Sequence, residues 1–320
     1  MTNNPIIRLE HVKVHFPETN GFRKRYLKAV DDVSFEIYAG ETVGLVGESG
    51  CGKSTLGRAV TKLLPATDGH IYFHEKDIYK LQGAEKTAYR KNVQMIFQDP
   101  AASLNPRLTV KEIIAEPLLF HVKISKEERE DLIKRMIQVV GLPEDAINRY
   151  PHEFSGGQQQ RIGIARSLVL HPEFIVCDEA VSALDVSVQA QVLNLLKQLK
   201  KDYNLTYLFI SHNLSVVKHM CDRIIVMYLG KIVEMGSTAQ IFENPLHPYT
   251  KALISAIPAA SVKHKSNRIV LSGDLPSPSE TPSGCAFHNR CFACEMDCDK
   301  KAPQLFEVEN GHWVSCIKCR

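Results

Sequence analysis

The chain has 320 residues, of which 39 are lysine or arginine and 36 are aspartate or glutamate, giving a net charge of +3. Hydrophobic residues make up 44% of the chain and charged residues 23%, which excludes a disordered or fibrous protein. The near-balanced charge gives no indication of nucleic-acid binding, and no window approaches the ~18–20 apolar residues of a membrane span. Residues 1–5 lack the features of a signal peptide, so we expect a cytosolic protein whose cysteines are thiols or metal ligands.

The N-terminal part has the apolar spacing of strands. Residues 6–16 predict a first strand, and Val33, Phe35 and Ile37 alternate with polar residues in a second, half-buried strand. The segment 18–28 between them is polar and basic, and we expect a loop there.

Further along the chain, predicted strands alternate with predicted helices. A strand at 42–46 precedes a helix at 54–64, and a long helix is indicated at 186–203 by leucine and valine at helical spacing. Apolar runs bounded by polar residues predict buried strands at 93–97, 174–177, 207–210 and 224–227. This alternation predicts an α/β fold with a largely parallel sheet, and the mostly helical segment after residue 105 predicts an inserted lobe.

The segment 47–54 reads Gly-Glu-Ser-Gly-Cys-Gly-Lys-Ser, which matches the phosphate-loop pattern G-x-x-x-x-G-K-S/T. It lies between a predicted strand and a predicted helix, which argues against a chance glycine-rich turn. Glycines let backbone N–H groups point inward, and the helix N-terminus adds partial positive charge. The predicted phosphate-binding residues are Gly47, Ser49, Gly50, Cys51, Gly52, Lys53, Ser54 and Thr55. Lys53 would reach the terminal phosphates, and the Ser54 hydroxyl would ligate Mg²⁺.

An apolar strand at 174–177 ends in two carboxylates, Asp178 and Glu179. Asp178 would hold Mg²⁺ through water, and Glu179 would polarise the attacking water as a general base. The alternative is an acidic turn after a core strand, which the nearby phosphate loop makes the weaker interpretation.

Four further motifs resemble those of the ATP-binding cassette (ABC) ATPases. They are Phe-Ser-Gly-Gly-Gln-Gln-Gln-Arg at 154–161, Val-Gln-Met-Ile-Phe-Gln-Asp-Pro at 93–100, Ser-Ala-Leu-Asp at 182–185 and Ile-Ser-His at 210–212. With the phosphate loop and the acidic pair they occur in the family's order, and the chain is identified as a member of it. The resemblance implies an α/β, ABC-type P-loop ATPase with a mixed sheet core, an inserted helical subdomain and a small Cys-rich C-terminal extension.

The resemblance also implies roles for single residues. Phe16 would stack on adenine, with Tyr26 as the alternative, because the chain between them is longer than usual. Gln98 would touch Mg²⁺ and the lytic water. His212 would contact the γ-phosphate, although a lone histidine is more often a satisfied core residue.

In such ATPases the signature motif acts on the nucleotide of a partner subunit. Ser155, Gly156, Gly157 and Gln158 would therefore face the γ-phosphate of a second ABC ATPase, most simply in a heterodimer. ATP would hold the two subunits together, and its hydrolysis would release them.

Several stretches resemble the "F"-type ATPase of oligopeptide/dipeptide importers, among them 97–107, 182–191, 227–234 and 244–253. The resemblance implies peptide import together with two membrane permeases and an extracytoplasmic peptide-binding protein, at the cytoplasmic face of the membrane. A nickel or metal-chelate importer is the nearest alternative. A DNA-repair or translation ATPase is disfavoured by the single short cassette, and a redox regulator on an ATPase scaffold is a further alternative.

Six of the nine cysteines lie in the last 36 residues. The family pattern there implies a 4Fe–4S cluster on Cys285, Cys291, Cys298 and Cys316. Two C-x-x-C pairs, 291–294 and 316–319, instead have the spacing of a Zn²⁺ site, and plain structural thiols are a third possibility. We therefore expect an ATPase domain over 5–257 with a helical subdomain at about 105–170, a Pro/Ser-rich linker at 258–284 and a Cys-rich region at 285–320.

Overall fold

The computed structural model describes residues 4–20, 23–257, 268–274, 276–277 and 279–319. Part of the expected linker at 258–284 therefore lies outside the described residues, and the domain boundaries at 257 and 284 stay predictions. The chain forms two compact units. Besides Met1–Asn4, unit 1 holds Tyr38–Glu41 and Lys76–Ile210, and unit 2 holds Pro5–Ile37, Thr42–Glu75 and Ser211–Arg320. No described helix has the length and apolar character needed to cross a membrane.

Unit 1 contains three parallel strands and the inserted helices. Its sheet pairs β6 with β7 and β7 with β8, as expected for strands that alternate with helices. The elements in chain order are β5 (Lys76–Asp77), α2 (Gly83–Asn92), β6 (Val93–Ile96), α3 (Pro100–Ser103), α4 (Val110–His121), α5 (Lys126–Val139), η1 (Glu144–Asn148), η2 (Pro151–Glu153), α6 (Gly156–Leu168), β7 (Phe174–Asp178), α7 (Val186–Tyr203) and β8 (Thr206–Ile210).

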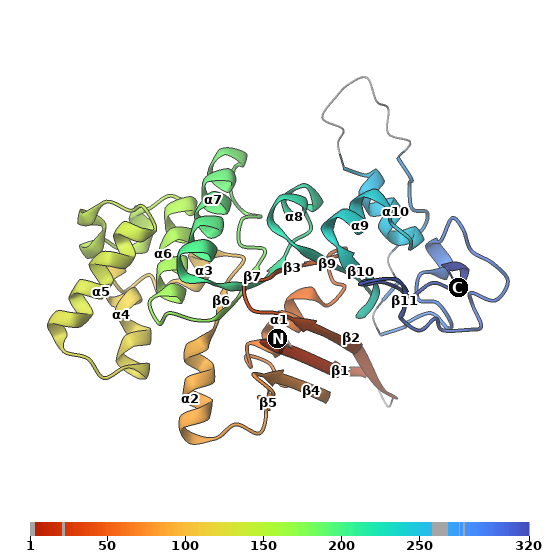
Figure 1. Cartoon of the computed structure of the whole chain (residues 1–320), viewed down its shortest axis with the longest axis horizontal. Helices are drawn as coiled ribbons and strands as arrows, with labels where there is room; N and C mark the ends of the chain where they lie inside the picture. Colours follow the sequence, from red (N-terminus) through yellow and green to blue (C-terminus); the bar gives the residue numbers. More distant parts are fainter. Residues whose placement is uncertain (1–3, 21–22, 258–267, 275, 278, 320) are drawn as a thin grey trace. The chain divides into compact units, whose positions relative to one another are not determined.

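Helices α4, α5 and α6 pack against one another, as Figure 1 shows in yellow and yellow-green. Capping boxes begin all three: the Thr109 and Glu112 side chains cap α4, Ser125 and Glu128 cap α5, and Ser155 and Gln158 cap α6. Each box satisfies two backbone N–H groups that a helix start would otherwise leave unpaired. The helical character predicted for this segment is therefore encoded locally.

Unit 2 contains an antiparallel sheet, a mixed sheet and the C-terminal tail. Its elements are β1 (Ile7–Asn20), β2 (Arg23–Ile37), β3 (Thr42–Val46), α1 (Lys53–Val60), β4 (Asp68–Phe73), α8 (Leu214–Met220), β9 (Arg223–Tyr228), β10 (Lys231–Ser237), α9 (Thr238–Glu243), α10 (Pro248–Ser255), η3 (His288–Arg290), β11 (Phe306–Glu309), β12 (His312–Val314) and η4 (Ile317–Cys319).

The mixed sheet of unit 2 runs in the order β11-β12-β10-β9-β3. Strand β3 is parallel to β9, and the other pairs are antiparallel. All five residues of β3 are buried, which explains the unbroken apolar run at 42–46. The tail strand β12 thus belongs to the same sheet as the strand that leads into the phosphate loop.

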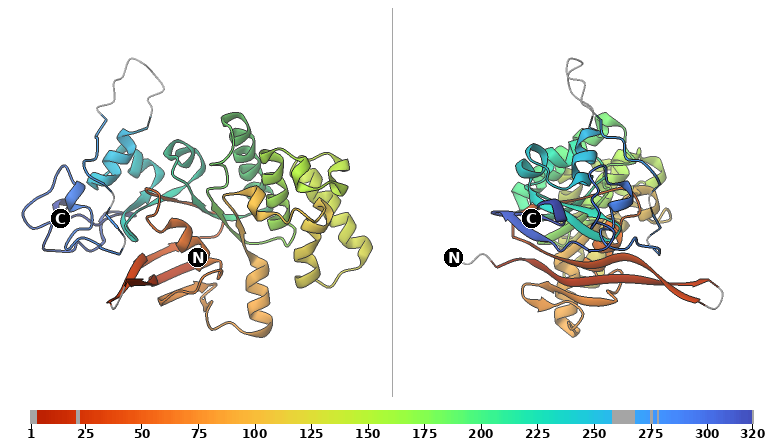
Figure 2. Two further views of the ribbon diagram at one scale, coloured as in Figure 1. Left: turned by 180° about the vertical axis from the view of Figure 1, so that it is seen from behind. Right: turned by 90° about the vertical axis from the view of Figure 1, so that its right-hand side faces the viewer.

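The expectation of a loop at 18–28 is wrong. Strands β1 and β2 form one long antiparallel hairpin, seen in the right-hand view of Figure 2. Its register pairs Phe16 with Leu27, Pro17 with Tyr26 and Glu18 with Arg25. Beyond the residues of β1 that pair with β4, no further strand of the described chain pairs with the hairpin. Its residues therefore lack the apolar alternation that marks a half-buried strand.

The helix expected at 54–64 ends earlier, at Val60. Lys62 has a left-handed backbone with φ of 58°, and the amides of Leu63 and Leu64 both donate to the Arg58 carbonyl at 2.8 and 3.0 Å. A left-handed residue that closes a helix in this way is a common C-terminal cap. The apolar pair at 63–64 therefore belongs to the turn after the helix.

Candidate functional site

The phosphate loop joins β3 to α1 and depends on its glycines. Gly47 and Gly52 have φ of 152° and 101°, values that other residues rarely adopt. A Cβ at Gly47 would collide with the Met227 carbonyl oxygen, and one at Gly52 would collide with the Ala29 carbonyl oxygen. These contacts with β9 and β2 explain why glycine is required at both positions, and they fix the loop at the start of α1.

Lys53 lies at the centre of this loop. Its side chain is 4% exposed, and Nζ donates to the Gly47 carbonyl at 2.8 Å and the Glu48 carbonyl at 2.9 Å. The buried thiol of Cys51 lies 3.7 Å from the same nitrogen, and burial raises the pKa of that thiol. The loop thus holds an ammonium group among backbone dipoles, which is an arrangement suited to an anion.

His212 follows β8 and lies in unit 2 with the phosphate loop. The amide of the preceding Ser211 donates to the Leu45 carbonyl at 3.2 Å, so this segment lies beside the end of β3. The His212 side chain is exposed. His212 therefore follows a residue that is hydrogen-bonded to β3, the strand that leads into the phosphate loop. Because the His212 side chain is exposed, the alternative of a buried core histidine is wrong.

Phe16 and Tyr26 lie on facing strands of the β1–β2 hairpin. Phe16 is 38% exposed and Tyr26 is 51% exposed, so both rings present accessible faces. The register places Pro17, not Phe16, opposite Tyr26. Both residues thus remain possible adenine platforms.

Unit 1 brings Gln98 and Glu179 together. The Gln98 Nε2 group donates to Glu179 Oε2 at 2.9 Å. Strand β7 carries Asp178 as its last residue, and this carboxylate is 2% exposed. The carboxyl ends of the parallel strands β6 and β7 are therefore followed by the amide and both acids.

Glu179 has an unusual backbone, with φ of 46°. Its amide donates to the Ile210 carbonyl at 3.0 Å, and its carbonyl accepts from the Ser182 hydroxyl at 2.9 Å and the Ser182 amide at 3.0 Å. A left-handed conformation at a non-glycine residue costs about 1–3 kcal/mol and is concentrated at functional sites. These bonds hold the turn that points Glu179 away from the strand.

The signature residues begin helix α6. Ser155 caps the helix: its hydroxyl accepts from the Gln158 amide at 3.4 Å, and the Gln158 side chain accepts from the Ser155 amide at 3.0 Å. Ser155 and Gly156 are exposed, whereas Gly157 is buried. A Cβ at Gly157 would collide with Val188 of α7. The helix start is thus accessible and fixed against the following element.

Four of the tail cysteines lie near one another. Burial raises the pKa of the Cys285 thiol to about 11, and the thiols of Cys298, Cys316 and Cys291 add to the effect. Within the described residues, however, no three His, Cys, Asp or Glu side chains are arranged to hold a metal ion. Three other thiols thus lie in the surroundings of Cys285, but the described cysteines do not form a ligand cage.

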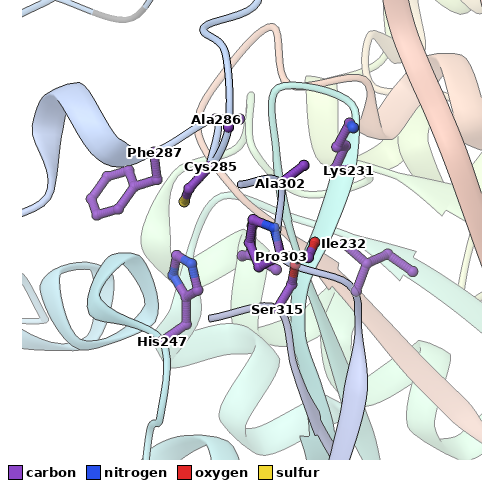
Figure 3. A pocket seen from close by; sticks show the side chains of 11 residues that line it. Lys231, Ile232, His247, Cys285, Ala286, Phe287, Ala302, Pro303 and Ser315 are labelled. Carbon is purple, nitrogen blue, oxygen red and sulfur yellow. Dashed lines mark hydrogen bonds between the residues drawn. The ribbon is translucent and has the colours of Figure 1, made fainter. Parts of the chain in front are cut away.

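A buried acid anchors the tail to the sheet. Glu234 of β10 is fully buried and accepts from the Leu246 amide at 2.7 Å, the His247 amide at 2.9 Å and the His312 Nε2 group at 2.8 Å. Next to it, His247, Cys285 and Phe287 line a pocket of about 30 Å³, shown in Figure 3. This pocket has room for a water molecule or two and is far too small for a nucleotide.

Comparison with known proteins places the chain in a family. The family described as "ABC transporter" matches residues 30–182, and "Oligopeptide/dipeptide transporter, C-terminal region" matches residues 233–298. The oligopeptide transport ATP-binding protein OppF of Escherichia coli is 51% identical, with 98% of this chain and 96% of that protein covered. The oligopeptide transport ATP-binding protein AppF of Bacillus subtilis is 50% identical, with 97% and 96% covered.

A solved structure supports the same assignment. An ATP-binding cassette in a dimeric post-hydrolysis state, bound to ADP and phosphate, matches with a TM-score of 0.65 and 30% identity over 72% of this chain and 98% of that one. The chain belongs to the ABC transporter family. The ABC fold and the ATPase activity predicted from the motifs are confirmed.

The predicted site residues of this ABC ATPase fall into two groups. Unit 1 holds Gln98, the acidic pair and the signature motif, and unit 2 holds the phosphate loop, His212 and the hairpin aromatics. Their individual roles stay predictions. One interaction was missed, the ion pair between Glu48 of the loop and Arg290 of the tail. The Phe-x-x-Arg-Cys pattern that ends at Cys291 contains this arginine but does not indicate which carboxylate pairs with it.

Proposed function

We propose that the phosphate loop of unit 2 binds ATP and that hydrolysis of this ATP drives oligopeptide import through membrane permeases. Lys53 carries the proposal, because its buried ammonium group lies at the start of α1, in a loop where a Cβ at Gly47 or Gly52 would collide with a backbone carbonyl oxygen. The relatives are oligopeptide transport ATP-binding proteins, which favours peptides over a nickel or metal chelate.

In this proposal the triphosphate lies against the loop amides at the start of α1, where the helix dipole favours anions. Lys53 Nζ then exchanges its bonds to the Gly47 and Glu48 carbonyls for bonds to the β- and γ-phosphates. Ser54, Gln98 and Asp178 carry the oxygen donors that Mg²⁺ prefers. When bound by these residues, Mg²⁺ would supply positive charge that offsets the charge of the phosphates.

Hydrolysis needs a water in line with the bond that breaks. Glu179 accepts a proton from this water as its oxygen bonds the γ-phosphorus, and the bond to the bridging oxygen breaks to leave ADP and phosphate. The Gln98 amide, 2.9 Å from Glu179, orients the carboxylate and the water. His212 contacts the γ-phosphate and holds the geometry of attack.

The start of α6 completes the site of a second ATPase subunit. Ser155 and Gly156 are exposed, which supports a role toward a nucleotide held by another chain. We infer a heterodimer with a related ATPase, bound to two permeases at the cytoplasmic face of the membrane, with a peptide-binding protein outside the cell.

Glu179→Gln tests the chemical step. The variant should bind ATP as well as the wild type, and its turnover should fall by ~10²–10⁴, the usual contribution of a general base. Lys53→Ala should instead lose ATP binding. Wild-type turnover in Glu179→Gln would remove this residue from the mechanism.

The transported substrate is tested with the permeases reconstituted in liposomes. Addition of a binding protein loaded with peptide should stimulate ATP hydrolysis, and one loaded with a nickel chelate should not. Stimulation by the chelate alone would favour the metal-importer alternative.

We further propose that Cys285, Cys291, Cys298 and Cys316 hold a 4Fe–4S cluster. The chemistry of the donor set supports this proposal, because four cysteine thiols are the ligands that such clusters use. No preformed metal site is present among the described residues, so cluster binding would draw the thiols together. Iron and acid-labile sulfide should be found in protein purified without oxygen. Zinc in a one-to-one ratio, without iron, would instead support the zinc alternative.

A further inference from the structure

The cysteine-rich tail reaches the phosphate loop through one ion pair. Arg290 of η3 donates from Nη1 to Glu48 Oε2 at 2.7 Å and from Nη2 to Glu48 Oε1 at 3.0 Å. Both residues belong to unit 2, and they are 242 positions apart in the chain. Such two-point pairing of a guanidinium with a carboxylate is strong and fixes direction. Glu48 is the second residue of the loop, directly after Gly47.

The arginine is held in place by aromatic rings. Its side chain is 9% exposed, and its guanidinium carbon lies 5.9 Å from the centre of the Tyr228 ring. Phe287, from the same tail turn, packs edge-on against Tyr228 with ring centres 5.1 Å apart. The position of Arg290 is therefore fixed by the segment that also carries the tail cysteines.

The backbone of Glu48 is held as well. Its amide donates to the Tyr249 hydroxyl at 2.8 Å. The Tyr249 ring in turn contacts Phe287, with centres 5.3 Å apart. Arg290 of the tail thus binds the Glu48 carboxylate, and Phe287 of the tail packs against Tyr249, whose hydroxyl accepts from the Glu48 amide.

Glu48 presents an electrostatic problem for an anion site. A carboxylate in a loop that binds a triphosphate repels the ligand, and partial burial weakens the screening by water. The pairing with Arg290 neutralises this charge. The hydrogen bonds from Arg290 also direct the carboxylate toward the tail.

We propose that Arg290 is a positioning residue of the nucleotide site: by neutralising and orienting Glu48, it makes ATP affinity depend on the cysteine-bearing tail. The inference rests on the proposed binding of ATP to the phosphate loop. It adds a regulatory input to that site from outside the ABC motifs.

Backbone hydrogen bonds connect Cys285 and Cys291 to the turn that carries Arg290. Turn η3 lies between Cys285 and Cys291, and the His288 amide donates to the Cys285 carbonyl at 3.0 Å. The Cys291 amide donates to the His288 carbonyl at 3.2 Å, and the Cys285 amide donates to the Cys298 carbonyl at 2.7 Å. Displacement of either cysteine therefore moves the turn that carries Arg290.

A charge-removal cycle in the full-length chain tests the proposal. Arg290→Met keeps much of the apolar bulk and leaves Glu48 unpaired, Glu48→Gln removes the acid, and the double variant removes both charges. Binding of Mg²⁺-ADP and of a non-hydrolysable ATP analogue is measured at equilibrium, with thermal unfolding as a check on folding.

Arg290→Met should weaken nucleotide binding about tenfold, which corresponds to about 1.4 kcal/mol. The double variant should recover to within about threefold of the wild type, because the repelling charge is gone. Arg290→Lys keeps the charge but loses the two-point pairing, so its affinity should lie between those of the wild type and Arg290→Met. Lys301→Met is the matched control, since Lys301 is a tail cation that pairs with Asp297 at 3.1 Å, and it should bind as the wild type.

Two results would overturn the proposal. Wild-type affinity in Arg290→Met would show that Glu48 needs no partner. Equal weakening in the single and double variants would show that Arg290 acts by packing alone. Lys53→Ala is run alongside to separate the two proposals. If Lys53→Ala still binds nucleotide, ATP does not bind at the phosphate loop, and both proposals are wrong. If Lys53→Ala loses nucleotide binding, the Arg290 variants decide the role of Arg290.

Discussion

His247 should make the folded chain sensitive to acid. Its side chain is 1% exposed, and Nδ1 accepts from the Tyr249 amide at 3.1 Å, which requires that nitrogen to carry no proton. Burial, with a smaller contribution from the Lys251 cation, lowers the pKa of His247 from 6.5 to about 3. The folded chain therefore keeps this ring neutral at pH values where an unfolded chain protonates it.

The size of the effect follows from this difference in pKa. Between pH 6.5 and pH 3 the unfolded chain binds a proton that the folded chain does not, so the stabilisation is present above pH 6.5 and is lost as the pH falls. Between pH 7 and pH 5 the free energy of unfolding should fall by about 2 kcal/mol through this group alone.

His247→Asn provides the comparison. Asparagine is a good helix N-cap and can still accept from the Tyr249 amide, but it does not titrate. Urea unfolding is followed through the fluorescence of Trp313, the single tryptophan, which pairs with Met235 in the same sheet. The variant should lose about 2 kcal/mol less than the wild type between pH 7 and pH 5.

The difference between His247→Asn and the wild type isolates the contribution of His247. Other acid-sensitive groups are shared by both proteins and cancel in the difference. His152→Asn, at an exposed histidine, should leave the wild-type pH dependence unchanged. If His247→Asn and the wild type lose equal stability, the neutral buried state of His247 is wrong.

Two other substitutions have clear structural consequences. Gly157→Ala should impair ATP hydrolysis and destabilise unit 1, because the new methyl group would collide with Val188. In the Gly157→Ala/Val188→Ala double variant, stability to urea should recover. A double variant as unstable as Gly157→Ala would argue against this contact. His312→Ala should destabilise the chain by about 3–5 kcal/mol, because it removes a partner from the buried Glu234 carboxylate; a loss below about 1 kcal/mol in Trp313-monitored unfolding would contradict a charged, paired Glu234.

The sequence allowed the phosphate site to be predicted because its determinants are local. Gly47, Gly52 and Lys53 lie within a few residues of one another, between a buried strand and a helix. The contact between Gln98 and Glu179 is explained by topology, since both residues come after neighbouring parallel strands and such strands end at one edge of a sheet. Spacing and topology were sufficient for these elements.

Other features depend on partners far away in the chain. Residues 18–28 of the β1–β2 hairpin were predicted as a loop because the side chains described there are mostly exposed and show no apolar alternation. The pairing of Arg290 with Glu48 could not be inferred, because nothing in the spacing of the tail indicates which carboxylate is its partner. Likewise, the docking of β12 on β10 involves only short segments whose propensities are weak.

The pairing of β12 with β10 affects how the tail can be studied. A chain that ends before residue 290 would leave one side of β10 with unsatisfied amides and carbonyls, a surface that favours aggregation. The same deletion would remove His312 from Glu234 and Arg290 from Glu48. Truncation would therefore mix three separate defects, and point substitutions are the cleaner way to learn what the cysteine-rich segment does.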